Sequence, residues 1–332
     1  SIDQTKTCLL AVMYGARTST WHENAIPEAV GVDAAKRLND LPLFANIVAD
    51  VKRAGAAILA VGGAAILLRP SGASHPLSRL NAGKLLLPQL EKKEIAHMLG
   101  DQRLTSNHLA MDYFPAIYQG KQYNLHLTLE KDLQEKVETL YERYNPAYAA
   151  FVAMDPETGR ILAMVDYSAE GHEGNLNLQA SFPAASIFKV VTSAAALGEG
   201  KIPKNTRFPV NGRYGTLYKS NLRDTVNRWT RFISIEEAFA KSVNTVFAKI
   251  AMNRVGPESM QRYADAFSFN QHIDFDMPME MGVAVVPRDD DFGLAESGSG
   301  YTRKQTLNPI QGAMIAASVI NGGRMPSHYL VS

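Results

Sequence analysis

The feature of this sequence that most constrains its fold is a proline-marked turn that runs into a long apolar segment. Residues 181–197 have the sequence SFPAASIFKVVTSAAAL, which predicts a helix that begins close to Pro183. Ser186 then falls in the first turn of this helix, and Lys189 lies one turn later on the same face. Free backbone N–H groups and the positive end of the helix dipole gather beside Ser186.

This serine–lysine pair has the chemistry of an activated nucleophile. A serine hydroxyl needs a neighbouring base, and a lysine that is desolvated by residues such as Phe188 and Val190 can serve as that base. A Ser-x-x-Lys string arises by chance roughly once in a chain of this length. The assignment is strengthened by a second motif further along the chain, Ser242-Val243-Asn244.

A second Ser-x-Asn string, Ser268-Phe269-Asn270, competes for the same role. It follows a stretch that looks like the end of a helix. Ser242 instead lies between two apolar helical stretches, 235–240 and 246–250. A polar turn held between two packed helices can aim a side chain rigidly at a site, and we therefore favour the motif at Ser242.

The two motifs resemble the signature of penicillin-binding proteins and class A β-lactamases, which is Ser-x-x-Lys, Ser-Asp-Asn and Lys-Thr-Gly. From about Tyr123 to Ser332 the chain resembles the transpeptidase domain of class B penicillin-binding proteins, with similar stretches at 149–165 and 307–323. Val243 stands where the signature has Asp, and no Lys-Thr-Gly follows it. We expect that element, with the family's remaining strands, beyond Ser332.

The resemblance implies an α+β fold of the penicillin-binding/β-lactamase-like kind, an antiparallel sheet flanked by a helical subdomain, with a smaller N-terminal region. Local patterns agree with it. Apolar residues recur at helical spacing over 130–144. Residues 148–154 and 160–165 have the composition of two strands, joined by a turn sequence at 155–159.

The N-terminal part of the chain is less informative. Residues 1–53 form a segment of unknown role. Residues 54–69 contain an apolar run between basic flanks, shorter than the roughly 20 residues of a spanning helix, and predict a membrane anchor or a buried helix. Residues 70–122 predict a linker or small pedestal with a helix over 85–99, and 123–332 form the transpeptidase domain, which lacks its C-terminal strands.

The resemblance implies a peptidoglycan D,D-transpeptidase that β-lactams inhibit. Ser186 attacks the carbonyl between the two terminal D-alanines of a stem peptide, and Lys189 accepts its proton. Ser242 passes a proton to the leaving amine, and Asn244 binds the substrate. The implied partners are stem peptides, β-lactam antibiotics and cell-wall synthesis proteins. The implied location is the bacterial cell envelope, with a catalytic domain anchored to the inner membrane outside the cytoplasm.

Two alternatives stay open: a β-lactam-binding sensor or catalytically incomplete scaffold of the same fold, and a D,D-carboxypeptidase or other serine hydrolase. The net charge of +1 gives no reason to expect a nucleic acid partner. The single cysteine, Cys8, excludes an internal disulfide and a zinc site built on several thiolates. We expect no cofactor and no metal.

Overall fold

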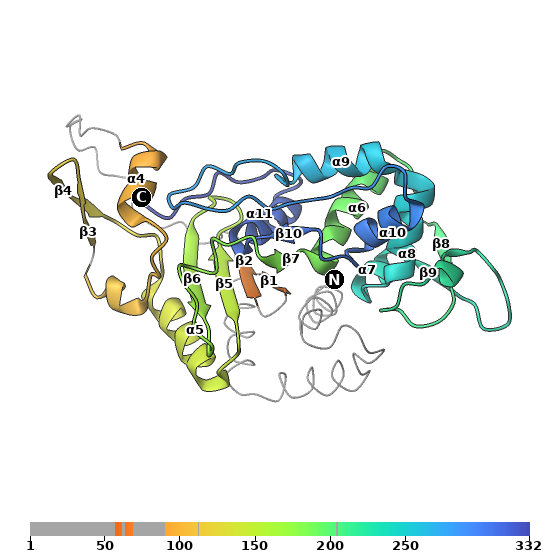
Figure 1. Cartoon of the computed structure of the whole chain (residues 1–332), viewed down its shortest axis with the longest axis horizontal. Helices are drawn as coiled ribbons and strands as arrows, with labels where there is room; N and C mark the ends of the chain where they lie inside the picture. The colour runs from red at the N-terminus through yellow and green to blue at the C-terminus, as the bar shows by residue number, and fades with distance from the viewer. Residues whose placement is uncertain (1–56, 62–63, 69–89, 112, 204) are drawn as a thin grey trace.

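The computed structural model describes residues 57–61, 64–68, 90–111, 113–203 and 205–332. These residues form an elongated molecule (Figure 1). A small region lies at one end, a β-sheet stands near the centre, and a helical half extends to the other end. The α+β class predicted from the sequence is confirmed.

The central sheet has four strands, in the order β1 (Ala57–Val61), β2 (Ala64–Leu68), β5 (Ala149–Met154) and β6 (Ile161–Tyr167). β5 and β6 pair antiparallel across the turn at 155–159, as predicted. β5 is buried at every position. Its two faces therefore both need a covering layer, because successive side chains point to opposite sides of a strand.

Two helices provide these layers. α5 (Lys131–Tyr144) places Val137 and Tyr141 against one face of β5 and β6. α11 (Pro309–Ile320) places Ile310 and Met314 against the other face. The predicted helix over 130–144 is thereby confirmed, and burial of its apolar stripe is the main source of its stability.

The prediction of a helix within residues 54–69 is wrong for the part that the structure describes. Residues 57–68 contribute β1 and β2, which pair antiparallel, and β2 lies parallel to β5. The sheet is therefore mixed rather than wholly antiparallel. The physical reason is that the exposed edge of β5 offers unpaired backbone groups, which an apolar segment can satisfy as a strand. Among the described helices, none has both the length and the apolar character to cross a bilayer.

The small region at the end of the molecule contains α4 (Lys92–Leu99), the 3₁₀ turn η1 (Ser106–Leu109) and the hairpin of β3 (Phe114–Tyr118) with β4 (Lys121–Leu125). The backbone N–H of Glu91 donates to the Glu94 side chain, which caps the start of α4. Ile95 and Leu99 pack into the same apolar core as α11. The predicted domain division stays a prediction, and residues 1–53 and 70–89 lie outside the described part of the chain.

The helical half contains the 3₁₀ turn η2 (Ala185–Ile187), α6 (Phe188–Gly198), η3 (Lys219–Leu222), α7 (Ile235–Ala240), α8 (Asn244–Ile250), the π-helical turn η4 (Ala251–Val255), α9 (Pro257–Ala266) and α10 (Asp291–Ser299). Its core is apolar and close-packed: Phe188 of α6 meets Phe269 edge-on at 5.3 Å between ring centroids. The hairpin of β8 (Arg207–Val210) and β9 (Arg231–Ser234) forms the far end.

A short two-stranded ladder connects the sheet region to the helical half. β7 (Phe182–Pro183) pairs antiparallel with β10 (Thr306–Leu307). The backbone N–H of Ala184 continues this pairing by donating to Gln305 O at 2.8 Å. The ladder fixes the chain immediately before Ser186.

Candidate active site

The predicted nucleophile lies where a tight turn becomes a helix. Ser186 is in the 3₁₀ turn η2, and Lys189 is in the first turn of α6. The end of α10 lies against this turn. Gly300 has a φ of +69°, and a Cβ at this position would lie 1.8 Å from the carbonyl oxygen of Ala185. Only glycine therefore permits this close approach beside Ser186.

Three oxygen atoms surround the ammonium nitrogen of Lys189, whose side chain is buried. Nζ lies 2.8 Å from Ser186 Oγ, 2.8 Å from Asn244 Oδ1 and 2.7 Å from Ser299 O. The amide and carbonyl oxygens can only accept hydrogen bonds. In a neutral lysine they take the two N–H groups, so the nitrogen lone pair faces the Ser186 hydroxyl. This arrangement suits a base that removes the serine proton.

The protonation of Lys189 is shifted in the direction that this role needs. Burial lowers the pKa of Lys189 to about 7, because desolvation disfavours the charged form. The ring of Phe247 also lies close, with its centroid 5.9 Å from Nζ. In a substantial fraction of the molecules, Lys189 is therefore the neutral amine near neutral pH.

The side chain of Ser242 contacts Ser186 directly. Its hydroxyl donates to Ser186 Oγ at 2.8 Å. Lys189 and Ser242 therefore both contact Ser186 Oγ. Ser242 has a φ of +51° in the turn between α7 and α8, a conformation that costs a non-glycine residue about 1 kcal/mol. Val243 is fully buried in the apolar core, which explains why an apolar residue fits at this position.

Asn244 uses both ends of its side-chain amide. Oδ1 accepts from Lys189, while Nδ2 donates to Gly215 O at 2.9 Å. Its backbone N–H donates to Tyr214 O at 2.9 Å. The amide is therefore held in one orientation by the loop before η3, and it in turn positions Lys189.

The competing motif has a different task. Asn270 donates from Nδ2 to Ala284 O and accepts from the Ala284 backbone N–H, at 2.9 Å and 3.0 Å. Ser268 lies just after α9 with a φ of +63°. Asn270 thus anchors a loop, whereas Ser242 and Asn244 are the residues that contact Ser186 and Lys189.

Sequence reasoning missed the groups that α10 contributes. Ser299 O accepts from Lys189, and Gly298 O accepts from the hydroxyl of Thr192 at 2.7 Å. Through these two hydrogen bonds, the end of α10 is attached to α6 close to Ser186. The available signal was the string Gly298-Ser299-Gly300, because glycines on both sides of a residue indicate close backbone approach.

Taken together, these contacts form an arrangement that would suit a serine nucleophile with a lysine base at the start of a helix. The sequence profile of the penicillin-binding protein transpeptidase domain matches residues 149–332, more than half of the chain. The chain belongs to this family. Ser186, Lys189, Ser242 and Asn244 all lie inside the matched range.

Individual relatives agree with this assignment. The chain is 28% identical over 278 residues to peptidoglycan D,D-transpeptidase PbpA of Mycolicibacterium smegmatis, covering 73% of this chain and 55% of that protein. It is 25% identical over 224 residues to stage V sporulation protein D of Bacillus subtilis, covering 61% of this chain and 34% of the relative. The chain thus spans about half, or less, of the length of the curated relatives it matches.

A solved structure gives the same result. Penicillin-binding protein A from M. tuberculosis, in its imipenem acyl-enzyme complex, superimposes with a TM-score of 0.51 at 25% identity. The match covers 62% of this chain and 54% of the other. It supports the fold described above.

Proposed function

We propose that this protein is a peptidoglycan D,D-transpeptidase that acts through an acyl-enzyme on Ser186. The observation that carries the proposal is the unbroken chain of contacts from Ser242 to Ser186, to Lys189 and to Asn244, each at 2.8 Å. The names of the relatives support it, since PbpA of Mycolicibacterium smegmatis is a peptidoglycan D,D-transpeptidase.

In the proposed acylation step, Ser186 Oγ attacks the carbonyl carbon between the two terminal D-alanines of a stem peptide. The serine proton passes to Lys189 as the new C–O bond forms. The backbone N–H of Ser186 supplies one donor to the developing oxyanion, an interaction for which a single donor typically contributes about a hundred- to thousandfold in rate. Asn244 keeps Lys189 in place and binds the substrate.

In the proposed transfer step, the proton must reach the departing D-alanine amine when the C–N bond breaks. Ser242 is placed for this transfer because its hydroxyl bonds Ser186 Oγ. The acyl group then moves from Ser186 to the amine of a second stem peptide, whose proton returns by the same groups. Attack by water instead of the amine would give a carboxypeptidase reaction from the same intermediate.

A β-lactam would acylate Ser186 in the same way, because its strained amide takes the place of the D-alanyl peptide bond. The M. tuberculosis neighbour was captured as an imipenem acyl-enzyme. We place the reaction in the bacterial cell envelope, with the catalytic domain outside the cytoplasm and held at the inner membrane. Cell-wall synthesis proteins are the proposed protein partners.

Labelling with a fluorescent penicillin tests the proposal. The wild-type protein should acquire a covalent label, and Ser186→Ala and Lys189→Ala should not, because they remove the nucleophile and the base. Ser268→Ala is the matched control, since it changes the serine of the competing motif, and it should label like the wild type. Equal labelling of Ser186→Ala and the wild type would refute the assignment.

A further inference from the structure

A group of cationic side chains gathers beside the nucleophile on its Ser242 side. The ring of Tyr214 contacts two of them: the guanidinium carbon of Arg231 lies 4.4 Å from the ring centroid, and the ammonium of Lys241 lies 5.7 Å from it. We call Tyr214, Arg231 and Lys241 the cationic rim. Lys241 directly precedes Ser242, so the rim begins one residue from the site.

The rim is fixed to the site by backbone contacts. The carbonyl of Tyr214 accepts the N–H of Asn244. Arg231 donates from Nη2 to Gly212 O at 3.0 Å. Loop 212–215 therefore contacts both the Arg231 side chain of β9 and the backbone of Asn244.

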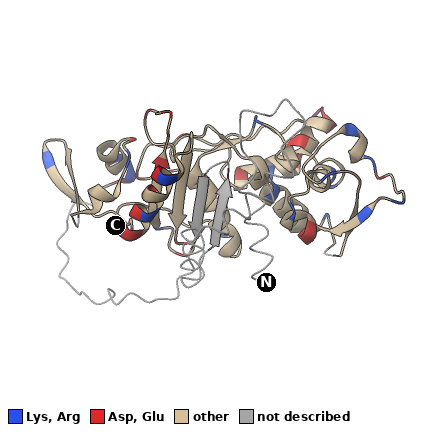
Figure 2. Cartoon of the chain, turned by 90° about the horizontal axis from the view of Figure 1, so that it is seen from below, with Lys and Arg blue, Asp and Glu red and all other residues tan. Residues whose placement is uncertain are grey.

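The charges of the rim are accessible. Arg231 and Lys241 are both exposed. Lys241 pairs with Glu237 at 2.6 Å, and both side chains of this pair are partly exposed, at 45% and 38%. Glu237 balances one of the two positive charges, which leaves the rim with a net positive charge. Basic segments also recur along the rest of this end of the molecule (Figure 2).

A polar hollow of about 490 Å³ adjoins the rim. It is lined by Gly212, whose carbonyl holds Arg231, and by Arg213, with hydroxyl, amide and aromatic groups from Thr216, Asn221 and Tyr218. Such a lining offers hydrogen-bond donors and acceptors to a peptide backbone. The hollow meets the rim at Gly212, whose carbonyl accepts the hydrogen bond from Arg231.

We propose that the cationic rim binds a free carboxylate of the acceptor stem peptide, and that the adjoining hollow holds the neighbouring part of that peptide. This inference rests on the proposed transpeptidase function. The incoming amine replaces the leaving amine and retraces its path past Ser242 in reverse. Groups close to the incoming amine must then lie on the side of Ser242, where the rim is. The preferred acceptor is an amine whose neighbouring carboxyl group is free rather than amidated.

Acceptor competition on the whole chain tests this inference. The enzyme is acylated with a soluble D-alanyl thioester donor, and transfer to D-alanine is compared with transfer to D-alaninamide. The two amines differ in basicity, so the informative quantity is the change in their transfer ratio between variants. Arg231→Gln and Lys241→Gln should each lower the ratio of acid to amide about fivefold, as expected for an exposed ion pair, mainly by raising KM for D-alanine.

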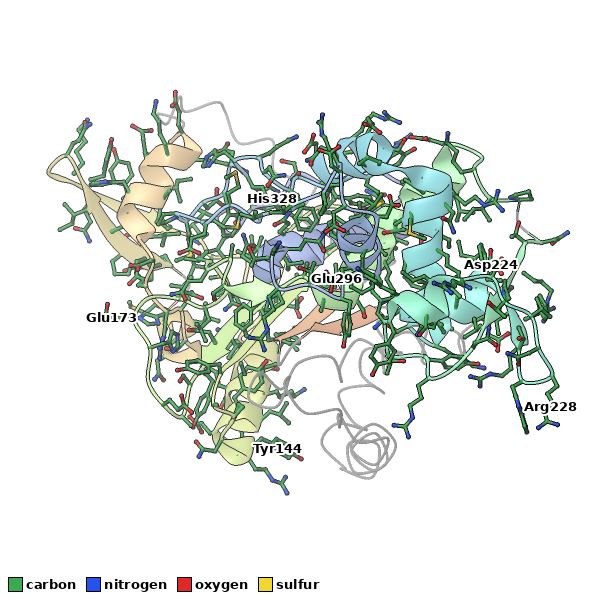
Figure 3. All side chains as sticks on the ribbon, turned by 45° about the vertical axis from the view of Figure 1, so that its right-hand side comes forward. Tyr144, Glu173, Asp224, Arg228, Glu296 and His328 are labelled. Atoms are coloured by element: carbon green, nitrogen blue, oxygen red, sulfur yellow. The ribbon has the colours of Figure 1, made fainter. Side chains whose placement is uncertain are left out.

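The matched control is Arg228→Gln. Arg228 lies on the same half of the molecule, but its guanidinium stacks over Trp229 at 4.7 Å and its side chain extends from the far end (Figure 3). This variant should keep the wild-type ratio. Added salt should reduce the wild-type ratio, because it screens exposed charges.

Two results would overturn the inference. The first is an equal acid-to-amide ratio in the wild type and the three variants. The second is a ratio lowered equally in Arg228→Gln, which would show that the overall positive charge of this end, rather than a contact at the rim, sets the preference. Thiol release from the donor separates this failure from failure of the proposed function. Release that depends on Ser186, combined with unchanged ratios, overturns only the acceptor site. Absence of release that depends on Ser186 overturns both proposals.

Discussion

Replacing Lys189 with arginine separates the two roles that a buried cation could have at this site. A lysine can lose its proton, whereas the guanidinium of an arginine stays charged at every accessible pH. If the only role of Lys189 is to stabilise negative charge during acylation, the Lys189→Arg variant should keep part of the wild-type acylation rate. If Lys189 is the base, the variant loses acylation at all pH values.

The magnitude follows from the burial of the side chain. With the ordinary pKa of 10.5, about one lysine in 3,000 would be neutral at pH 7, whereas with the lowered pKa of about 7 roughly half are neutral. Burial therefore raises the population of the active base about a thousandfold. Below pH 7 the neutral fraction falls, so acylation should slow about fivefold from pH 7 to pH 6 and approach tenfold per unit below that.

The measurement is the second-order rate constant of acylation by a fluorescent penicillin between pH 5.5 and 9. The wild-type rate should rise with pH and reach a plateau above about pH 8. Lys189→Arg should be about a thousandfold slower than the wild type at the plateau, with no recovery at high pH. A wild-type rate that does not change with pH, or an arginine variant within tenfold of the wild type, would refute the reasoning.

Two further predictions concern the close packing at Gly300 and the protonation of the buried His328. Gly300→Ala should slow acylation about a hundredfold by displacing the turn at Ser186, whereas Gly322→Ala, where a Cβ meets no atom within 4 Å, should leave it unchanged; comparable rates in both variants would contradict this. Burial, reinforced by Lys92, lowers the pKa of His328 below its usual 6.5, so the unfolded chain binds this proton more readily and stability is lost as the pH falls below about 6.5. The melting temperature of the wild type should therefore decline more steeply from pH 7 to pH 5 than that of His328→Phe. The difference in unfolding free energy behind this should be at most about 1.4 kcal/mol per pH unit. Parallel declines of the two melting temperatures would exclude His328 as the cause.

Local patterns allowed the main elements of the central sheet region to be predicted. α5 carries its apolar residues at helical spacing, and β5 and β6 flank a turn-forming sequence at 155–159. In each case the information lies within a few neighbouring residues. The region 57–68 was mispredicted because a short apolar run suits a helix or a strand equally, and pairing with β5 decides between them.

The sequence by itself determined the serine–lysine pair, because two residues three apart on a helix must share one face. It also indicated Ser242 and Asn244, through the apolar stretches on either side of them. Only the tertiary structure decided that Ser242 contacts Ser186 rather than Lys189, and that Ser299 O completes the surroundings of Lys189. These contacts join segments far apart in the chain, and the pKa of Lys189 depends on their combined exclusion of water, which no local pattern encodes.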